Sequence, residues 1–370
     1  MRIALFTETF LPAIDGVVTR LRHTIEELVR IGDEVLIFAP SGGPDSYAGA
    51  RIYQVPGVSF PPYPQIQLSP PHAGIGRALR QFNPDVIHTV NPYVLGVGGI
   101  FYARYLKVPL VASYHTNVAA YARFYRLGFL EGAGRWWART LHNRARINLC
   151  TSEATLDYLL RGGIKHVRLW PQGVDARSFC PERASYEWRV RLSGGHPDKK
   201  LLLFVGRLAP EKSIRQLRAV LREFSNARLA IVGDGPARKG LEREFLGTPA
   251  IFTGLLKGDD LAAAYASADL FLFPSATETL GMVMIEALAS GLPVVAARSG
   301  AAHEVVSGGK NGLLYEPGSS SELVAAVRHV LENDALRGAL VQGARAAVAE
   351  RSWEASTATL RGYYEEALSF

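Results

Sequence analysis

The chain has 370 residues, more than the roughly 250–300 residues at which a single hydrophobic core stops growing, so two domains are expected. Hydrophobic residues make up 48% of it and charged residues 20%, which is typical of a folded globular protein and excludes a disordered one. Two cysteines without a CxxC pattern argue against a disulfide scaffold and a structural zinc site. The sequence has neither a signal-peptide pattern nor an apolar run of about 18 residues, so we expect a cytoplasmic protein without a membrane span.

The net charge of +7 is concentrated in the first half of the chain. Residues 1–180 hold 19 Lys and Arg against 12 Asp and Glu, whereas the two kinds of charge balance over residues 181–370. Such asymmetry indicates that the first half meets an anionic membrane surface or nucleic acid, and a solubilising surface is the alternative.

Short apolar runs alternate with amphipathic stretches along the first half, which predicts a parallel sheet wrapped by helices. His88 follows one of these runs and is more typical of a hydrogen-bonded strand residue than of a catalyst. A helix is expected over residues 19–31. The expected strands are residues 3–6, 35–39, 86–87, 110–112, 147–149 and 167–169.

The second half repeats this pattern, with a helix expected over residues 213–224 and a helical tail from about residue 319. The polar stretch 175–199 contains Pro and Gly and predicts the domain boundary. The expected strands are residues 201–205, 229–232, 270–273 and 294–296. The expected domains are a first domain over 1–178, a second over 199–352 and a closing helix over 353–370. Two such domains are expected to face each other across a cleft at the carboxyl ends of their strands, where open α/β sheets bind ligands.

Glycine-rich turns recur where predicted strands end. Glycine there lets backbone N–H groups approach an anion, and a helix N-terminus adds its dipole. Arg207 and Lys212 add full positive charges to one of these turns. The turns are residues 12–18, 206–212 and 233–236. No GxxxxGK[ST] motif occurs, which excludes a Walker-type nucleotide site.

The most informative segment is residues 274–286, which follows a predicted strand and opens a helix. Glu278 and Glu286 lie about 12 Å apart along such a helix at its ~1.5 Å rise, too far apart for a glycosidase pair. They are instead placed to hold two hydroxyl-bearing ends of one long ligand. The N–H groups of residues 279–281 would then face a diphosphate. The alternative is that Glu278 is an N-cap and Glu286 an ordinary surface residue.

The sequence resembles the family 4 retaining glycosyltransferases of the GT-B fold over nearly its whole length. The motifs that carry this resemblance are Gly206-Arg207…Glu211-Lys212, Gly233-Asp234-Gly235 and Glu278-x7-Glu286. The resemblance implies two Rossmann-like parallel-sheet domains that enclose a nucleotide sugar, held mostly by the second domain. It also implies a C-terminal helix that returns to the first domain. The family needs no metal and the chain has no D-x-D motif, so we expect no cofactor.

The resemblance implies a role for each motif. Arg207 and Lys212 would neutralise the diphosphate, and Gly16 would bring the first domain's backbone to the phosphates. Glu278 would bind the sugar hydroxyls and Glu286 those of the ribose. The implied catalytic residues are His115, Arg207, Lys212 and Glu278. The implied donor-binding residues are Gly16, Gly206, Arg207, Lys212, Gly233, Gly254, Glu278, Thr279, Leu280, Gly281 and Glu286.

Motifs of the first half, among them residues 111–116 and 169–175, are similar to the sulfoquinovosyltransferases, which move sulfoquinovose from UDP-sulfoquinovose to diacylglycerol. Gln172, Asn117 and Ala276 differ from the usual residues of that subfamily. Another family 4 hexosyltransferase that uses GDP-mannose or UDP-glucose with a lipid or small-molecule acceptor is therefore an alternative. A sugar-nucleotide binding module without turnover is the alternative that is not an enzyme.

Residues 121–146 hold six Arg and one Glu among several aromatic residues. This composition suits an anionic membrane interface. It also suits RNA stacking, but no nucleic-acid motif accompanies it, so no nucleic-acid partner is expected. We expect peripheral docking on the inner face of a membrane, which brings a lipid acceptor within reach. The expected acceptor and membrane residues are Tyr121, Arg123, Phe124, Tyr125, Arg126 and Trp136.

Overall fold

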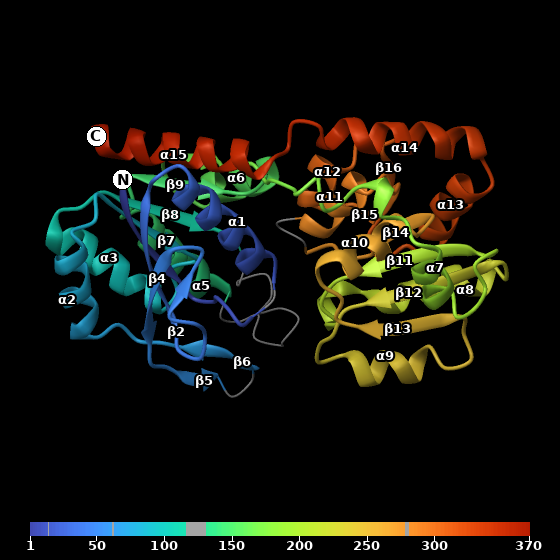
Figure 1. Ribbon diagram of the computed structural model, residues 1–370, viewed down its shortest axis with the longest axis horizontal. Helices are drawn as coiled ribbons and strands as arrows, with labels where there is room; N and C mark the ends of the chain where they lie inside the picture. Colours follow the sequence, from blue (N-terminus) through green and yellow to red (C-terminus); the bar gives the residue numbers. More distant parts are fainter. Residues whose placement is uncertain (14, 61–62, 116–130, 278–280) are drawn as a thin grey trace. The chain divides into compact units, whose positions relative to one another are not determined.

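The computed structural model describes residues 1–13, 15–60, 63–115, 131–277 and 281–370, which form two compact units (Figure 1). The first unit comprises Met1–Gly173 together with Trp353–Phe370, and the second comprises Val174–Ser352. Each unit has its own largely parallel sheet flanked by helices. The predicted fold class, two Rossmann-like α/β domains with a C-terminal helix that belongs to the first, is therefore confirmed.

In the described part of the first unit, eight strands form a sheet in the order β10-β9-β8-β7-β1-β2-β4-β3, and β3 is antiparallel to β4. Strand β1 is central, with Ile3 opposite Val35 on one side and Val86 on the other. The strands are β1 (Arg2–Thr7), β2 (Glu34–Pro40), β3 (Ser46–Tyr47), β4 (Ala50–Val55), β7 (Val86–Val90), β8 (Leu110–Tyr114), β9 (Ile147–Cys150) and β10 (Val167–Leu169). A separate hairpin joins β5 (Val58–Phe60) to β6 (Tyr63–Leu68).

Helices cover both faces of this sheet. The side chains of a strand point alternately to the two faces, so strands that are apolar throughout need a helical layer on each face. Ala4 and Phe6 of β1 pack in one cluster with residues of α2, α3 and α5, whereas α1 and α15 pack together and α15 reaches β7 and β8. Helix α1 begins before the predicted residue 19, because the Asp15 side chain accepts a hydrogen bond from the N–H of Val18 at 2.8 Å. The helices are α1 (Gly16–Arg30), α2 (Ala73–Phe82), α3 (Leu95–Leu106), α5 (Glu131–His142), α6 (Glu153–Arg161) and α15 (Trp353–Ser369).

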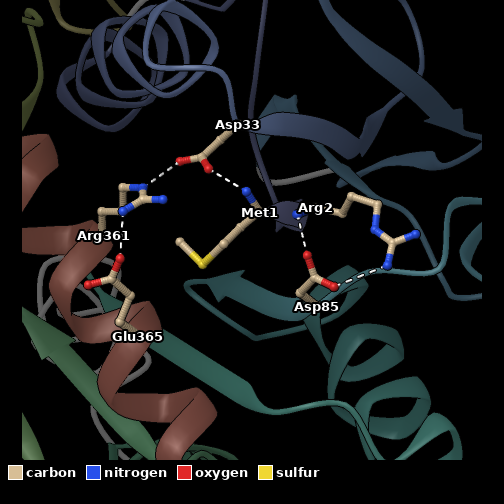
Figure 2. A network of polar contacts seen from close by, with 6 residues as sticks. All are labelled: Met1, Arg2, Asp33, Asp85, Arg361 and Glu365. Carbon is tan, nitrogen blue, oxygen red and sulfur yellow. Dashed lines mark hydrogen bonds and ion pairs between the residues drawn. The ribbon is translucent and has the colours of Figure 1, made fainter.

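A polar network attaches the C-terminal helix α15 to the start of the chain (Figure 2). The buried carboxylate of Asp33 accepts hydrogen bonds from the Met1 amino group at 2.5 Å and from Arg361 Nε at 3.0 Å. Arg361 also pairs with Glu365 one turn further along α15. The Met1 amino group and Arg361 thus supply positively charged hydrogen-bond donors to the carboxylate, which compensates for its removal from water. The network therefore joins the first residue of the chain, the residue directly before β2 and the last helix of the described structure.

In the described part of the second unit, six parallel strands follow the order β13-β12-β11-β14-β15-β16. Each strand predicted for this half lies within one of them. The strands are β11 (Lys200–Val205), β12 (Ala227–Val232), β13 (Ala250–Gly254), β14 (Leu270–Phe273), β15 (Val294–Ala297) and β16 (Gly312–Tyr315). The helices are α7 (Tyr186–Leu192), α8 (Leu217–Glu223), α9 (Arg238–Glu244), α10 (Gly258–Ala266), α11 (Met282–Ala289), α12 (Gly300–Val305), α13 (Ser320–Leu331) and α14 (Asp334–Val348).

The helix predicted over residues 213–224 forms only in its second half. Ser213, the first residue of the predicted range, has a left-handed φ of +52°, which a right-handed helix does not adopt, and the next three residues form a 3₁₀ turn. Two short 3₁₀ turns, Pro210–Lys212 and Ile214–Gln216, flank it, and α8 then begins at Leu217. Lys212, the candidate phosphate-binding lysine, therefore lies on a tight 3₁₀ turn and not at the end of a regular helix.

The first unit also ends earlier than the sequence predicted, at Gly173 instead of 178, and the stretch 175–199 belongs to the second unit. Arg189 of α7 explains this placement. Its guanidinium donates hydrogen bonds to the backbone oxygens of Pro197 at 2.7 Å and Ser267 at 2.9 Å, and it pairs with Asp269 at 2.9 Å. A polar, Pro- and Gly-containing stretch is thus a packed part of the second unit and not a linker.

Candidate functional site

Three of the predicted donor-binding glycines lie where three neighbouring strands of the second unit end. The N–H of Gly206, after β11, donates to the Val232 oxygen at 3.0 Å, and the N–H of Gly233, after β12, donates to the Gly254 oxygen at 2.8 Å. A Cβ on Gly233 would lie 2.0 Å from the Gly206 oxygen, and its φ is +134°. Only glycine permits this approach, so the strand ends present backbone instead of side chains.

The turns that follow β11 and β12 are hydrogen-bonded to each other. The N–H of Leu208 donates to the Asp234 oxygen at 2.9 Å, and the Leu208 oxygen accepts from the N–H of Ala237 at 2.9 Å. A Cβ on Gly235 would lie 2.5 Å from that Leu208 oxygen. The two Gly-rich turns singled out in the sequence therefore form one continuous rim at the carboxyl edge of the sheet.

Arg207 and Lys212, the two predicted cations, both belong to this rim. Nη2 of Arg207 lies 2.6 Å from Oε1 of Glu211, whose side chain is fully buried while that of Arg207 is 43% exposed. Nζ of Lys212 lies 5.6 Å from the centroid of the Phe273 ring, at the end of β14. Glu211 thus orients Arg207, a role that the sequence alone did not reveal although the Glu stands four residues after the Arg.

Glu286 lies on α11, which follows β14, and its residue is 9% exposed. Its Oε2 accepts a hydrogen bond from the Tyr265 hydroxyl of α10 at 3.0 Å. Burial raises the pKa of Glu286 to about 7, against the lowering effect of the Tyr265 hydrogen bond. The alternative of a surface helix residue is excluded. The sequence did not reveal Tyr265 as the hydrogen-bond partner of Glu286, because Tyr265 lies on another helix.

Gly281 provides the entry to α11. It has a left-handed φ of +67°, and its oxygen accepts from the N–H groups of Met284 at 3.0 Å and Ile285 at 3.2 Å. Left-handed geometry of this kind favours glycine. The predicted sugar and phosphate residues Glu278, Thr279 and Leu280 lie outside the described residues, so their roles stay predictions.

In the first unit, Gly16 and His115 lie after the carboxyl ends of β1 and β8. Gly16 is the first residue of α1. His115 is buried, its N–H donates to Oδ1 of Asn91 at 2.8 Å, and its Nε2 lies 2.9 Å from the Ser113 hydroxyl. Burial, together with the positive charge of Arg20, holds the pKa of His115 well below its ordinary value of 6.5. The ring is therefore neutral at physiological pH.

Helix α5 carries the described part of the predicted membrane surface. Trp136 is 57% and Trp137 39% exposed, with ring centroids 6.3 Å apart. Arg135 and Arg139 on the same helix are also exposed. Tyr121, Arg123, Phe124, Tyr125 and Arg126 lie outside the described residues. Among the helices that the structure does describe, none is both long and apolar enough to span a bilayer.

The sequence as a whole matches proteins that transfer sugars. The family model "Glycosyltransferase Family 4" matches residues 14–178, and "Glycosyl transferases group 1" matches residues 188–347. The whole chain is 39% identical to sulfoquinovosyl transferase SQD2 of Arabidopsis thaliana, of which the matched region covers 74%. The chain is a family 4 glycosyltransferase.

Other relatives of this glycosyltransferase act on different sugars by name. It is 38% identical, over all of its length and 98% of the relative, to a GDP-mannose-dependent alpha-mannosyltransferase of Mycolicibacterium smegmatis. It is 30% identical, over 85% of its length and 75% of the relative, to alpha-monoglucosyldiacylglycerol synthase of Streptococcus pneumoniae. The structure of HepE from Anabaena in complex with UDP has a TM-score of 0.82 at 21% identity, over 99% of this chain and all of that one. This likeness supports the GT-B fold.

We predict that Glu286→Gln flattens the pH dependence of this glycosyltransferase's stability. The carboxyl titrates near pH 7 when folded and near 4.5 ordinarily, so between these values the folded state holds a proton that the unfolded state has released. The free energy of unfolding of the wild type therefore falls as the pH rises from about 4.5 to 7, and the variant lacks this contribution.

Urea unfolding at several pH values from 5 to 8 measures the effect. The wild type should lose stability relative to Glu286→Gln toward high pH, and Glu350→Gln, at an exposed site, should follow the wild type. A constant difference between the wild type and Glu286→Gln over this range would contradict the assigned burial of a neutral carboxyl.

Proposed function

We propose that this glycosyltransferase moves sulfoquinovose from UDP-sulfoquinovose to diacylglycerol, with retention of the anomeric configuration and without a metal ion. The observation that carries the choice of sugar is the 39% identity to SQD2 over the whole chain. A relative named as a monoglucosyldiacylglycerol synthase supports diacylglycerol as the acceptor. The UDP-sugar donor is the one that the resemblance to the sulfoquinovosyltransferases implies.

The rim of the second unit suits the leaving nucleoside diphosphate. Arg207 and Lys212 would neutralise the charge that grows on the diphosphate as the bond to the sugar breaks, together with the N-terminal end of α11. Glycines at the strand ends leave room for the phosphates to approach the backbone. Glu286 would accept hydrogen bonds from the ribose hydroxyls. Cations supplied by the protein make a metal unnecessary in this scheme.

The transfer itself exchanges one bond for another at the anomeric carbon. The bond to the diphosphate oxygen breaks, a bond to the acceptor oxygen forms on the same face of the sugar, and the acceptor hydroxyl proton passes to the leaving diphosphate. A neutral, buried His115 is poorly suited to carry a positive charge as a nucleophile. We therefore give His115 the task of positioning the sugar by a hydrogen bond.

A mannosyltransferase that uses GDP-mannose is the second candidate. It is favoured by the 38% identity to the Mycolicibacterium smegmatis enzyme, which extends over the whole chain. The two candidates share the diphosphate site and differ in the base and the sugar. The sugar is the part of the donor that Glu278 would contact.

We also propose that the protein docks on the inner, cytoplasmic face of a membrane through α5. Exposed Trp136 and Trp137 beside Arg135 and Arg139 combine apolar insertion with attraction to anionic lipid. Diacylglycerol stays in the bilayer, so an enzyme that uses it needs such a surface.

A donor panel tests the proposed reaction. The purified chain is incubated with diacylglycerol vesicles, EDTA and one of UDP-sulfoquinovose, UDP-glucose or GDP-mannose, and lipid products are identified by mass spectrometry. We expect sulfoquinovosyl diacylglycerol with an α linkage, as read from the anomeric proton by NMR. Arg207→Ala should lower the turnover about 10²–10³-fold, because it removes charge stabilisation of the leaving group.

The control variant is Arg215→Ala, which removes an exposed arginine that pairs with Glu244 near the same turn, and it should retain wild-type turnover. A mannosyl product alone would establish the second candidate instead. A β linkage would refute retention, and loss of transfer in EDTA would refute metal independence. Donor binding without any product would favour a binding module.

We expect Arg135→Glu combined with Arg139→Glu to release the protein from anionic vesicles. Each arginine near an anionic surface contributes about 1 kcal/mol, and reversal of both charges replaces attraction by repulsion. Co-sedimentation with phosphatidylglycerol-containing and pure phosphatidylcholine vesicles measures the binding. Arg161→Glu on α6, whose side chain is 84% exposed, is the control and should keep most of the binding. Equal sedimentation with both vesicle types would contradict docking by charge.

A further inference from the structure

We propose that Glu8 is a positioning residue that joins two segments of the first unit, the loop that leads to Gly16 and the turn that holds His115. The loop lies between β1 and α1, and residues 9–13 and Asp15 are its described part. The turn comprises residues 91–94, between β7 and α3. The part that these segments play in sugar transfer rests on the proposed function. Their attachment to each other is a property of the first unit and is measurable without any substrate.

The Glu8 carboxylate accepts hydrogen bonds from four consecutive backbone N–H groups at the start of α3. Oε1 accepts from Tyr93 at 2.9 Å, Val94 at 2.8 Å and Gly96 at 3.0 Å, and Oε2 accepts from Leu95 at 3.1 Å. Glu8 directly follows β1, whereas the four N–H groups follow β7, the neighbouring parallel strand. The carboxylate thus bridges the carboxyl ends of two adjacent strands of the described sheet.

The sequence of α3 supplies no side-chain cap for its own N-terminus. Val94 is the N-cap residue, and its side chain makes no capping hydrogen bond. The first N–H groups of a helix lack partners within the helix, and the partial positive charge at this end favours an anion. Glu8 supplies both the acceptor atoms and the negative charge from a different element.

The four N–H groups also favour the ionised form of this partly buried side chain. Burial raises the pKa of Glu8, and the hydrogen bonds from residues 93–96 act against this rise. An ionised carboxylate suits the position, because it only accepts hydrogen bonds and faces only donors there. Carboxylate and helix end therefore depend on each other.

The loop that starts at Glu8 is hydrogen-bonded at both of its ends. The Thr7 hydroxyl donates to the Thr9 oxygen at 2.7 Å. At the other end, Oδ1 of Asp15 accepts from the N–H of Val18 at 2.8 Å, and Oδ2 of Asp15 lies 3.4 Å from the Thr9 hydroxyl. Gly16, the first residue of α1, directly follows Asp15. Release of Glu8 from α3 would therefore free the start of the segment that leads to Gly16.

The turn 91–94 holds the backbone of His115. Asn91 has a left-handed φ of +49°, an uncommon conformation that needs support from its surroundings. Its N–H donates to the Ser113 oxygen at 2.8 Å, and its Oδ1 accepts from the N–H of His115 at 2.8 Å. Tyr93, two residues later, donates the first of the N–H groups that Glu8 accepts. Glu8 thus supports the turn in the conformation in which Asn91 reaches His115.

A joint between these two segments matters for the proposed transfer. The resemblance assigns Gly16 to the phosphates and His115 to the sugar of the same donor, so their separation has to match one ligand. A misplacement of about 1 Å in a catalytic site costs up to about 10²-fold in rate. Glu8 itself is not expected to touch the substrate. Its loss should therefore lower kcat and leave the affinity for the nucleotide, which is assigned to the rim of the second unit.

Asp85 offers a matched comparison, because it bridges the amino ends of the same two strands. Its Oδ2 accepts from the N–H of Arg2 at 2.7 Å, and its Oδ1 lies 3.2 Å from Nη2 of Arg2 (Figure 2). Arg2 begins β1, and Asp85 directly precedes β7. Glu8→Gln and Asp85→Asn therefore each remove one negative charge and keep the shape of the side chain, at opposite ends of one strand pair.

Amide hydrogen exchange measured by NMR tests the joint. In Glu8→Gln, the new NH₂ group faces backbone donors, so we expect exchange at residues 93–96 to become at least about tenfold faster, as for the loss of a charged acceptor. We also expect faster exchange at Ala13, whose N–H donates to the Phe10 oxygen at 3.1 Å, and at His115. Asp85→Asn should leave all of these amides unchanged and accelerate exchange at Arg2.

The pattern of exchange separates a joint from a simple helix cap. Faster exchange at residues 93–96 alone, with Ala13 and His115 as in the wild type, would show that Glu8 only caps α3 and would overturn the proposal. Unchanged exchange at residues 93–96 would overturn it as well. If Glu8→Gln does not fold, Glu8→Asp, which keeps the charge and withdraws it by one methylene group, is measured with the same expectations.

Activity gives a second readout that depends on the proposed function. Glu8→Gln should lower kcat for transfer about 10–10²-fold and bind UDP as tightly as the wild type in calorimetry. Asp85→Asn should match the wild type in both. A wild-type kcat in Glu8→Gln would refute the role in transfer. If the wild type transfers none of the sugars in the panel, the proposed function fails, while the exchange data still decide whether Glu8 joins the two segments.

Discussion

Arg20, a buried cation with which no carboxylate in the described part of the chain pairs, organises the polar interior of the first unit. Arg20 is held by two backbone oxygens after β10 and by the face of Trp170. Trp170 in turn donates from its indole to the Ser356 oxygen of α15 at 3.2 Å. The arginine therefore fixes the tryptophan, and the tryptophan contacts the helix that closes the unit. Removal of this charge from the interior would alter His88 and His115, because their neutrality depends partly on it.

The two units solve different problems with different residues. In the second unit, the backbone is exposed at the carboxyl edge of the sheet, because a side chain at Gly233 or Gly235 would collide with the neighbouring backbone. Arg207 and Lys212 add two positive charges to this rim. An edge of this kind receives anions. In the first unit, the carboxyl edge instead carries the neutral His115, which is held by hydrogen bonds to Asn91 and Ser113. One edge thus suits charge neutralisation and the other suits hydrogen bonding.

Local patterns were enough to predict much of this arrangement. Uninterrupted apolar runs such as 201–205 indicated buried parallel strands. The turn that carries Arg207 and Lys212 was predicted as well, because the glycine and the charged residues that identify it lie within a few positions of one another. Contacts between distant segments were not readable. Tyr265 was not linked to Glu286, nor Glu8 to the start of α3, because periodicity shows which face of an element is buried and not which polar group it meets there. The start of the helix predicted from residue 213 was also missed, because the left-handed φ of Ser213 and the 3₁₀ turns beside it leave no periodic pattern in the sequence.

The proposed reaction requires that the rim of the second unit holds the nucleoside diphosphate. Hydrogen–deuterium exchange with and without saturating UDP tests it most directly, since exchange of backbone amides reports where the nucleotide binds. We expect slower exchange in residues 206–212 and 233–235 and in the first turn of α11, with α9 and α13 unchanged. Saturation by UDP that slows exchange only elsewhere, or that leaves these segments unchanged, would contradict it.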